Sequence, residues 1–152
     1  MKKILSLILS LIICISITAC GNTAKEIDIN ALSGELLNAQ IFDEELTQVK
    51  TSVTIKRLGL NEADIEECVA YAGTKAVVDE IVLIKAVEGA YGDVQAALNK
   101  HVDTQIKSYT SYRPEEVPKL EEALSLSFGN YVMLIVSNNS EKAQEIVDKS
   151  TK

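Results

Sequence analysis

Two short apolar runs constrain the fold of this 152-residue chain more than any other feature. Residues 81–84 are four consecutive aliphatic side chains, and residues 131–136 form the most apolar strand-like segment in the chain. Because successive side chains of a strand point to opposite faces of the sheet, an uninterrupted apolar strand is buried on both faces. We therefore predict an inner strand of a sheet over residues 79–87.

Each apolar run belongs to a predicted β-hairpin. Residues 68–72 precede the strand at 79–87, with Gly73-Thr74-Lys75 near the end of the first strand. In the second hairpin, residues 123–128 alternate apolar residues with serine before residues 131–136. Gly129-Asn130 supplies the turn between them, although Asn-Gly is the commoner order.

Helical spacing follows each hairpin and also precedes the first. Asp28 and Asp93 begin two predicted helices, and Asn138 or Asn139 caps a third, because a short polar side chain can accept the free amides of a first turn. A short helical turn ends at Gly59, and Asn61 offers a further cap. The predicted fold class is α+β, with one antiparallel sheet from two β-hairpins, each followed by a helix, N-terminal helices, and helices packed on one face.

The N-terminus has the pattern of a secretory signal. Met1-Lys2-Lys3 is a short basic start, and residues 4–17 are almost entirely apolar residues and serines. Signal peptides contain an apolar stretch of about 7–15 residues, whereas a membrane-spanning helix needs about 20. We expect a signal peptide over residues 1–19, and the alternative is an uncleaved N-terminal membrane helix.

The end of this segment resembles the lipobox of bacterial lipoproteins. Ile17-Thr18-Ala19-Cys20 places an aliphatic residue and two small residues before a cysteine, although leucine is the usual first residue. The resemblance implies that diacylglycerol is attached to Cys20 and that the chain is cleaved after Ala19, with the thiolate as nucleophile. Two acyl chains hold a protein on a bilayer, so we expect the chain on the outer face of the cell membrane.

The rest of the chain has the size of one domain and is acidic. We expect residues 20–27 to be a lipidated tether and residues 28–152 a single α+β domain. Loss of Lys2 and Lys3 with the signal changes the formal net charge from −7 to −9. An acidic surface is repelled by nucleic acid, so the expected partners are the membrane, through diacylglycerol on Cys20, and a neighbouring membrane or envelope protein.

Cysteine and histidine offer little chemistry in this domain. Cys68 remains after Cys14 leaves with the signal and Cys20 takes lipid, so it has no partner for an internal disulfide. We interpret Cys68 as a small buried hydrophobe in a strand. His101 is the single histidine, which is too few for a multi-histidine metal site, and we interpret it as a surface residue.

Acidic runs at 43–45, 62–67, 115–116 and 121–122 lack the ligand spacing of a calcium loop, and we interpret them as solvated faces. The sequence also lacks a phosphate-binding glycine loop and a Gly-x-Ser-x-Gly elbow. We therefore predict no catalytic residue, no metal site and no cofactor. The ligand-binding candidates are Tyr109, Tyr112 and Arg113, and the alternative is that the tyrosines pack a turn and bond to the backbone.

Several short motifs resemble an uncharacterised family of Gram-positive lipoproteins, domain of unknown function 4358. The motifs are Asp64-Ile65-Glu66-Glu67 before Tyr71, Asp79-Glu80-Ile81, Tyr112 with Pro114-Glu115, Gly129-Asn130-Tyr131-Val132, Val136-Ser137, and Lys142-Ala143. The likeness spans most of residues 28–148. It supports a lipoprotein and implies no activity and no catalytic residues.

These observations favour a membrane-tethered binding or accessory domain without enzymatic activity. The acidic surface and the absence of catalytic motifs both point this way. One alternative is a cell-envelope hydrolase that uses paired carboxylates from the acidic runs. Another is a structural component of the envelope.

Overall fold

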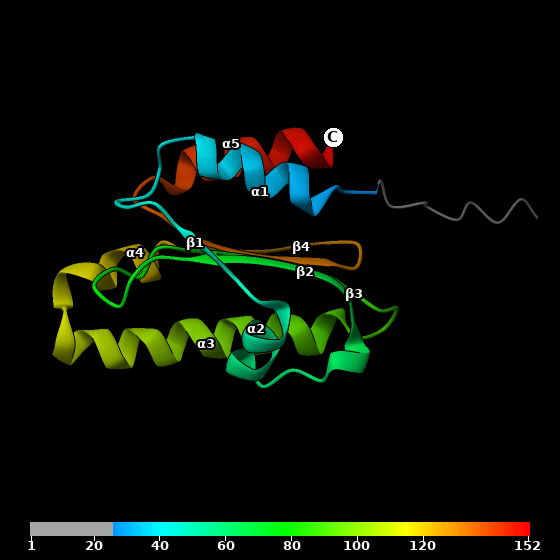
Figure 1. Ribbon diagram of the computed structural model, residues 1–152, viewed down its shortest axis with the longest axis horizontal. Coiled ribbons are helices and arrows are strands. Elements are labelled where there is room, and N and C mark those ends of the chain that lie inside the picture. Colours follow the sequence, from blue (N-terminus) through cyan, green and yellow to red (C-terminus); the bar gives the residue numbers. More distant parts are fainter. Residues whose placement is uncertain (1–25) are drawn as a thin grey trace, which may run out of the picture.

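The computed structural model describes residues 26–152, which form three layers (Figure 1). A five-stranded sheet lies in the middle. Helices α1 (Ile29–Asn38) and α5 (Ser140–Thr151) lie side by side on one face. On the other face lie α2 (Thr51–Leu58), α3 (Tyr91–Tyr112) and α4 (Val117–Glu121).

All neighbouring strands of the sheet are antiparallel, in the order β1-β2-β3-β5-β4. Their bounds are β1 Thr47–Val49, β2 Ile65–Ala72, β3 Glu80–Ala86, β4 Leu124–Phe128 and β5 Tyr131–Val136. The two predicted hairpins, β2-β3 and β4-β5, are confirmed, and they join where Leu83 of β3 pairs with Met133 of β5. The predicted α+β class is therefore confirmed.

The predicted inner strand is β3, which lies between β2 and β5. Ile81 and Leu83 enter the core beneath α1 and α5, while Val82 and Ile84 enter the core against α3. All four side chains are fully buried, as an uninterrupted apolar run requires. Strands β3 and β5 therefore each contribute side chains to two separate cores, one on each face of the sheet.

The helices cover both faces of the sheet, and not one face as predicted (Figure 1). The cause lies in β3 and β5, whose side chains are apolar on both sides. An apolar face left in water would be unfavourable by roughly 25 cal/mol per Å². Both faces therefore need a helical layer.

Two of the predicted helix caps are present. The Asp28 carboxylate accepts the backbone amides of Asn30 and Ala31 at the start of α1. Asn139, one of the two candidates for the final cap, accepts the amide of Lys142. Helix α3 begins at Tyr91, two residues before the predicted Asp93, and has no side-chain cap.

Local patterns were less informative where tertiary contacts decide the structure. Asn61 caps only a 3-10 turn, Glu62–Asp64, and β2 begins directly after it at Ile65 and not at Cys68. The segment after α3 contains a second 3-10 turn, Pro114–Glu116, and then α4, neither of which the sequence pattern predicted. None of the helices within residues 26–152 has both the length and the apolar character needed to cross a bilayer.

Candidate functional site

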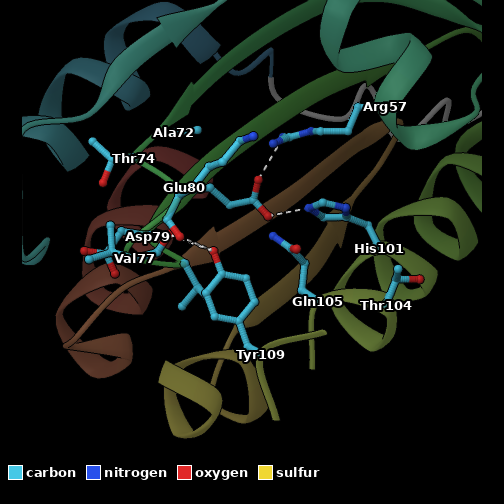
Figure 2. Close-up of a pocket in the computed structure, with 13 residues that line it drawn as sticks. Arg57, Ala72, Thr74, Val77, Asp79, Glu80, His101, Thr104, Gln105 and Tyr109 are labelled. Atoms are coloured by element: carbon cyan, nitrogen blue, oxygen red, sulfur yellow. Dashed lines mark hydrogen bonds and ion pairs between the residues drawn. The ribbon is translucent and has the colours of Figure 1, made fainter. Parts of the chain in front are cut away.

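A cavity of about 370 Å³ opens at one end of β3 (Figure 2). Its wall contains the start of β3, the loop that joins β2 to β3, and residues of α2 and α3. This loop follows Ala72 and includes Gly73, which lies so close to Val77 and Glu44 that a Cβ atom there would clash. The cavity is therefore bounded by three segments that are distant in sequence: α2 at Arg57, residues 72–80, and residues 101–109 of α3.

Glu80 is the central charged residue of the cavity wall, and its side chain is only 3% exposed. Its Oε2 accepts a hydrogen bond from Arg57 Nη2 at 2.8 Å, and its Oε1 lies 2.7 Å from His101 Nε2. Arg57 comes from α2 and His101 from α3, and both point toward Glu80 (Figure 2). A buried carboxylate is tolerated only when such partners replace its lost hydration.

The interpretation of His101 as a surface residue is wrong. Its side chain is only 10% exposed, bonds to Glu80 and lines the cavity together with Arg57 of α2. The helical stripe of α3 marks the face that packs against the sheet, but the partner carboxylate lies on a different element. Spacing within α3 alone could not reveal this contact.

A second ionic group lies beside the cavity, and we call it the Lys119 cluster: Asp43, Asp79, Glu116 and Lys119. Lys119 Nζ lies 3.2 Å from Asp79 Oδ1 and 3.1 Å from Glu116 Oε2, and it also bonds to Asp43. The Asp79 side chain is fully buried, and its Oδ2 accepts the backbone amide of Asp43 at 2.6 Å. Acidic residues from separate runs of the sequence thus meet at one lysine.

The charged groups of the Lys119 cluster shift one another's pKa values. Burial acts to lower the pKa of Lys119, but hydrogen bonds to Asp43 and Glu116 and the charge of Asp79 outweigh it and raise that pKa well above 10.5. Hydrogen bonds from Lys119 and Asn138 lower the pKa of Asp43. Burial raises the pKa of Asp79, and the Asp43 amide and Lys119 oppose that shift. Lys119 therefore keeps its positive charge throughout the neutral range.

The interpretation of the acidic runs as solvated faces is wrong for Glu116, whose side chain is 9% exposed. Its Oε2 also accepts the backbone amide of Val78 at 3.1 Å. Asp43, by contrast, remains 42% exposed. Glu116 therefore ties the start of α4 to the loop that forms the cavity wall.

The carboxylates that line the cavity already have hydrogen-bond partners within the protein, whereas two other polar side chains do not. Both oxygens of Glu80 and both oxygens of Asp79 have partners. Gln105 and Lys75 also line the cavity, and their side chains make no hydrogen bond or ion pair with residues 26–152. An amide and an ammonium group are therefore available to a polar ligand.

Of the three predicted ligand-binding residues, only Tyr109 lines the cavity. Its hydroxyl donates to the backbone carbonyls of Lys75 and Val77, at 3.2 and 3.3 Å, and burial raises its pKa. Tyr112 packs edge-on against Tyr109 and is 64% exposed. Arg113 pairs with Glu115 at 3.5 Å. The structure therefore separates Tyr112 and Arg113 from the cavity.

The cysteines carry no site within the described residues. Cys68 is a half-buried residue of β2 that packs against the α3 core, and burial raises its pKa from 9.0 to about 11. A thiol with that pKa is almost fully protonated at neutral pH. Cys20, the predicted lipidation site, lies outside the described residues.

Within residues 26–152, no group of three or more histidine, cysteine, aspartate or glutamate side chains could hold a metal ion. Sequence analysis missed Arg57, Glu80 and Lys119 as site residues. One available signal was the position of Asp79-Glu80 directly before four buried aliphatic residues. Two acids at the end of an inner strand need buried partners, although the sequence does not identify them.

A family model described as Domain of unknown function (DUF4358) matches residues 40–137. The chain belongs to this family. The matched residues contain all five strands and every residue of the cavity wall, while α1 and α5 lie outside them. Searches against curated proteins and against solved structures returned no match.

Proposed function

We propose that this protein is a lipid-anchored binding domain on the outer face of the cell membrane, and that the Glu80 cavity holds a small polar solute. The observation that carries the proposal is the cavity itself. Its volume of about 370 Å³ falls within the roughly 300–1,000 Å³ of small-molecule sites. The lipobox-like Ile17-Thr18-Ala19-Cys20 supports the anchor.

The polar groups of the cavity favour binding over hydrolysis. A general acid or base must exchange a proton with its substrate, and both oxygens of Glu80 are held by Arg57 and His101. The Gln105 amide and the Lys75 ammonium group can instead donate hydrogen bonds to a ligand without loss of an internal contact. A fixed wall with free donors is the usual arrangement of a preformed binding site.

The anchor is tested by replacement of the lipidated residue. We expect Cys20→Ala to release the protein from the membrane fraction, because no thiol remains for diacylglycerol. Cys68→Ala is the matched control and should stay with the membrane. Mass spectrometry of the wild type should find a lipidated N-terminal Cys20. A wild-type chain that retains Lys2 would contradict the anchor.

The binding role is tested by filling the cavity. We expect the full-length protein, purified from membranes, to carry a polar solute that mass spectrometry of the denatured sample identifies. Gln105→Trp should remove that solute, because the indole would occupy the cavity. Gln48→Trp, on the exposed edge strand β1, is the control and should retain it. Recovery of the same solute from both variants, or from neither variant nor the wild type, would contradict this role.

A further inference from the structure

A second hollow, which we call the basic hollow, lies between the end of α2 and the middle of α3. Its volume is about 220 Å³. The charged and titratable side chains that line it are Lys56, Arg57, Lys100 and His101, and no carboxylate does so. The basic hollow is thus a local concentration of positive charge on an acidic chain whose formal net charge is −7.

The lysines of the basic hollow lack counterions among residues 26–152. Arg57 is paired with Glu80, but neither Lys56 nor Lys100 takes part in an ion pair within this part of the chain. Two or more cations that face one hollow repel each other. An anion in the hollow would relieve this repulsion and add charge-assisted hydrogen bonds.

Helix stabilisation accounts for only part of this arrangement. Lys56 and Arg57 lie in the last turn of α2, where positive charge favours the negative end of the helix dipole. Lys100 and His101, however, belong to the interior of α3, where the dipole offers no such benefit. The convergence of cations from two helices therefore needs a different explanation.

His101 belongs to both hollows. Its Nε2 is engaged by Glu80, and this contact fixes the position of the ring (Figure 2). No hydrogen bond joins Nδ1 to another residue of the described chain. The Glu80 carboxylate accepts the Nε2 hydrogen, so Nδ1 of a neutral ring is a hydrogen-bond acceptor. His101 therefore forms part of the wall of the hollow, and the lysines supply its donors.

We propose that the basic hollow binds a phosphate group, either as free phosphate or as a phosphate ester. Phosphate matches the hollow because it is compact, carries one or two negative charges near neutral pH and is able to accept several hydrogen bonds. The ammonium groups of Lys56 and Lys100 supply most of the attraction. This site is distinct from the Glu80 cavity, and its assignment does not depend on the proposed function.

The test is calorimetric titration of the full-length protein in a nonionic detergent, at constant ionic strength, since salt screens exposed charges. Inorganic phosphate and the diester glycerophosphoglycerol are the two probes. We expect saturable binding of at least one probe with one site per chain. Binding of phosphate alone identifies a site for the free ion, and equal or tighter binding of the diester identifies a site for esters.

Variants link that binding to the basic hollow. Lys56→Gln and Lys100→Gln should each weaken binding by about tenfold, the loss of one charge-assisted hydrogen bond. Lys107→Gln is the matched control, because Lys107 is also an exposed lysine of α3 but lies outside the hollow. Absence of saturable binding to both probes, or equal weakening by Lys107→Gln, would overturn the proposal.

Discussion

At the scale of single residues, Glu80 shows how this domain accommodates a charge at the end of an inner strand. The strand continues into four fully buried aliphatic side chains, and the Glu80 side chain itself is only 3% exposed. Arg57 is 33% exposed and reaches the carboxylate from the solvent side, while His101 closes the other side. The three residues hold α2 and α3 against the end of β3.

Glu80→Gln should destabilise the protein by about 1–3 kcal/mol, because the amide has the same shape but leaves Arg57 without its counterion. Urea unfolding should show a lower midpoint with an unchanged m-value. Glu115→Gln is the control, since Glu115 is 61% exposed and its pair with Arg113 spans 3.5 Å. Exposed pairs contribute about 0–1 kcal/mol, so a comparable loss in both variants would contradict the importance of burial at Glu80.

At the scale of elements, sequence periodicity predicted best where local signals and packing agree. The apolar runs placed β3 and β5 correctly, and Asp28 identified the start of α1. Alternation and capping act within a few residues, so they can be recognised without knowledge of the rest of the fold. These two strands and this cap could therefore be predicted from the local sequence alone.

The elements that sequence missed depend on distant partners. Strand β1 is only three residues long and is defined by its pairing with Ala70–Ala72 of β2. Helix α4 contains five residues, too few for a stable isolated helix. Its side chains Leu120 and Lys119 contact a core and an ionic cluster built from other elements. The Glu80 site was missed for the same reason, because its ion pairs join residues 23 and 21 positions apart.

Substitution by alanine should change stability with opposite signs at Gly34 of α1 and at Gly59, which ends α2. Gly59 ends α2 with a φ of 69°, a conformation that alanine adopts at a cost of roughly 1 kcal/mol. Gly34 lies within α1, where a new Cβ atom would meet nothing within 4 Å, so alanine should stabilise by about 0.5–1 kcal/mol. Thermal unfolding of Gly59→Ala and Gly34→Ala measures both. A shift of the same sign in the two variants would contradict this assignment.

At the scale of the whole molecule, the Lys119 cluster connects α4 to the segments that precede β1 and β3. Asp43 precedes β1, Asp79 precedes β3, and Lys119 belongs to α4. Asn138, which follows β5, donates to the Asp43 carboxylate at 2.8 Å. Segments from both helical layers therefore meet at one end of the sheet. Loss of the central positive charge should affect the stability of the entire domain.

Lys119→Gln should destabilise the folded state by about 2–4 kcal/mol at pH 7, because it leaves the buried Asp79 without a cation. The folded-state pKa of Lys119 is raised above 10.5, so its contribution is complete below pH 10.5 and is lost as pH rises through the folded-state pKa. The pKa of Asp43 is lowered from 3.8, so its contribution is present above pH 3.8 and is lost in stronger acid. Burial raises the pKa of Asp79 above 3.8, so acid neutralises Asp79 before Asp43. Urea unfolding of both proteins should therefore give a difference in unfolding free energy that is constant from neutral pH to pH 10.5 and smaller at higher pH and in acid. Lys142→Gln, whose partner Glu145 is 62% exposed, is the control and should match the wild type at every pH. A Lys119→Gln difference that persists unchanged above pH 10.5 would show that packing, and not charge, explains the role of Lys119.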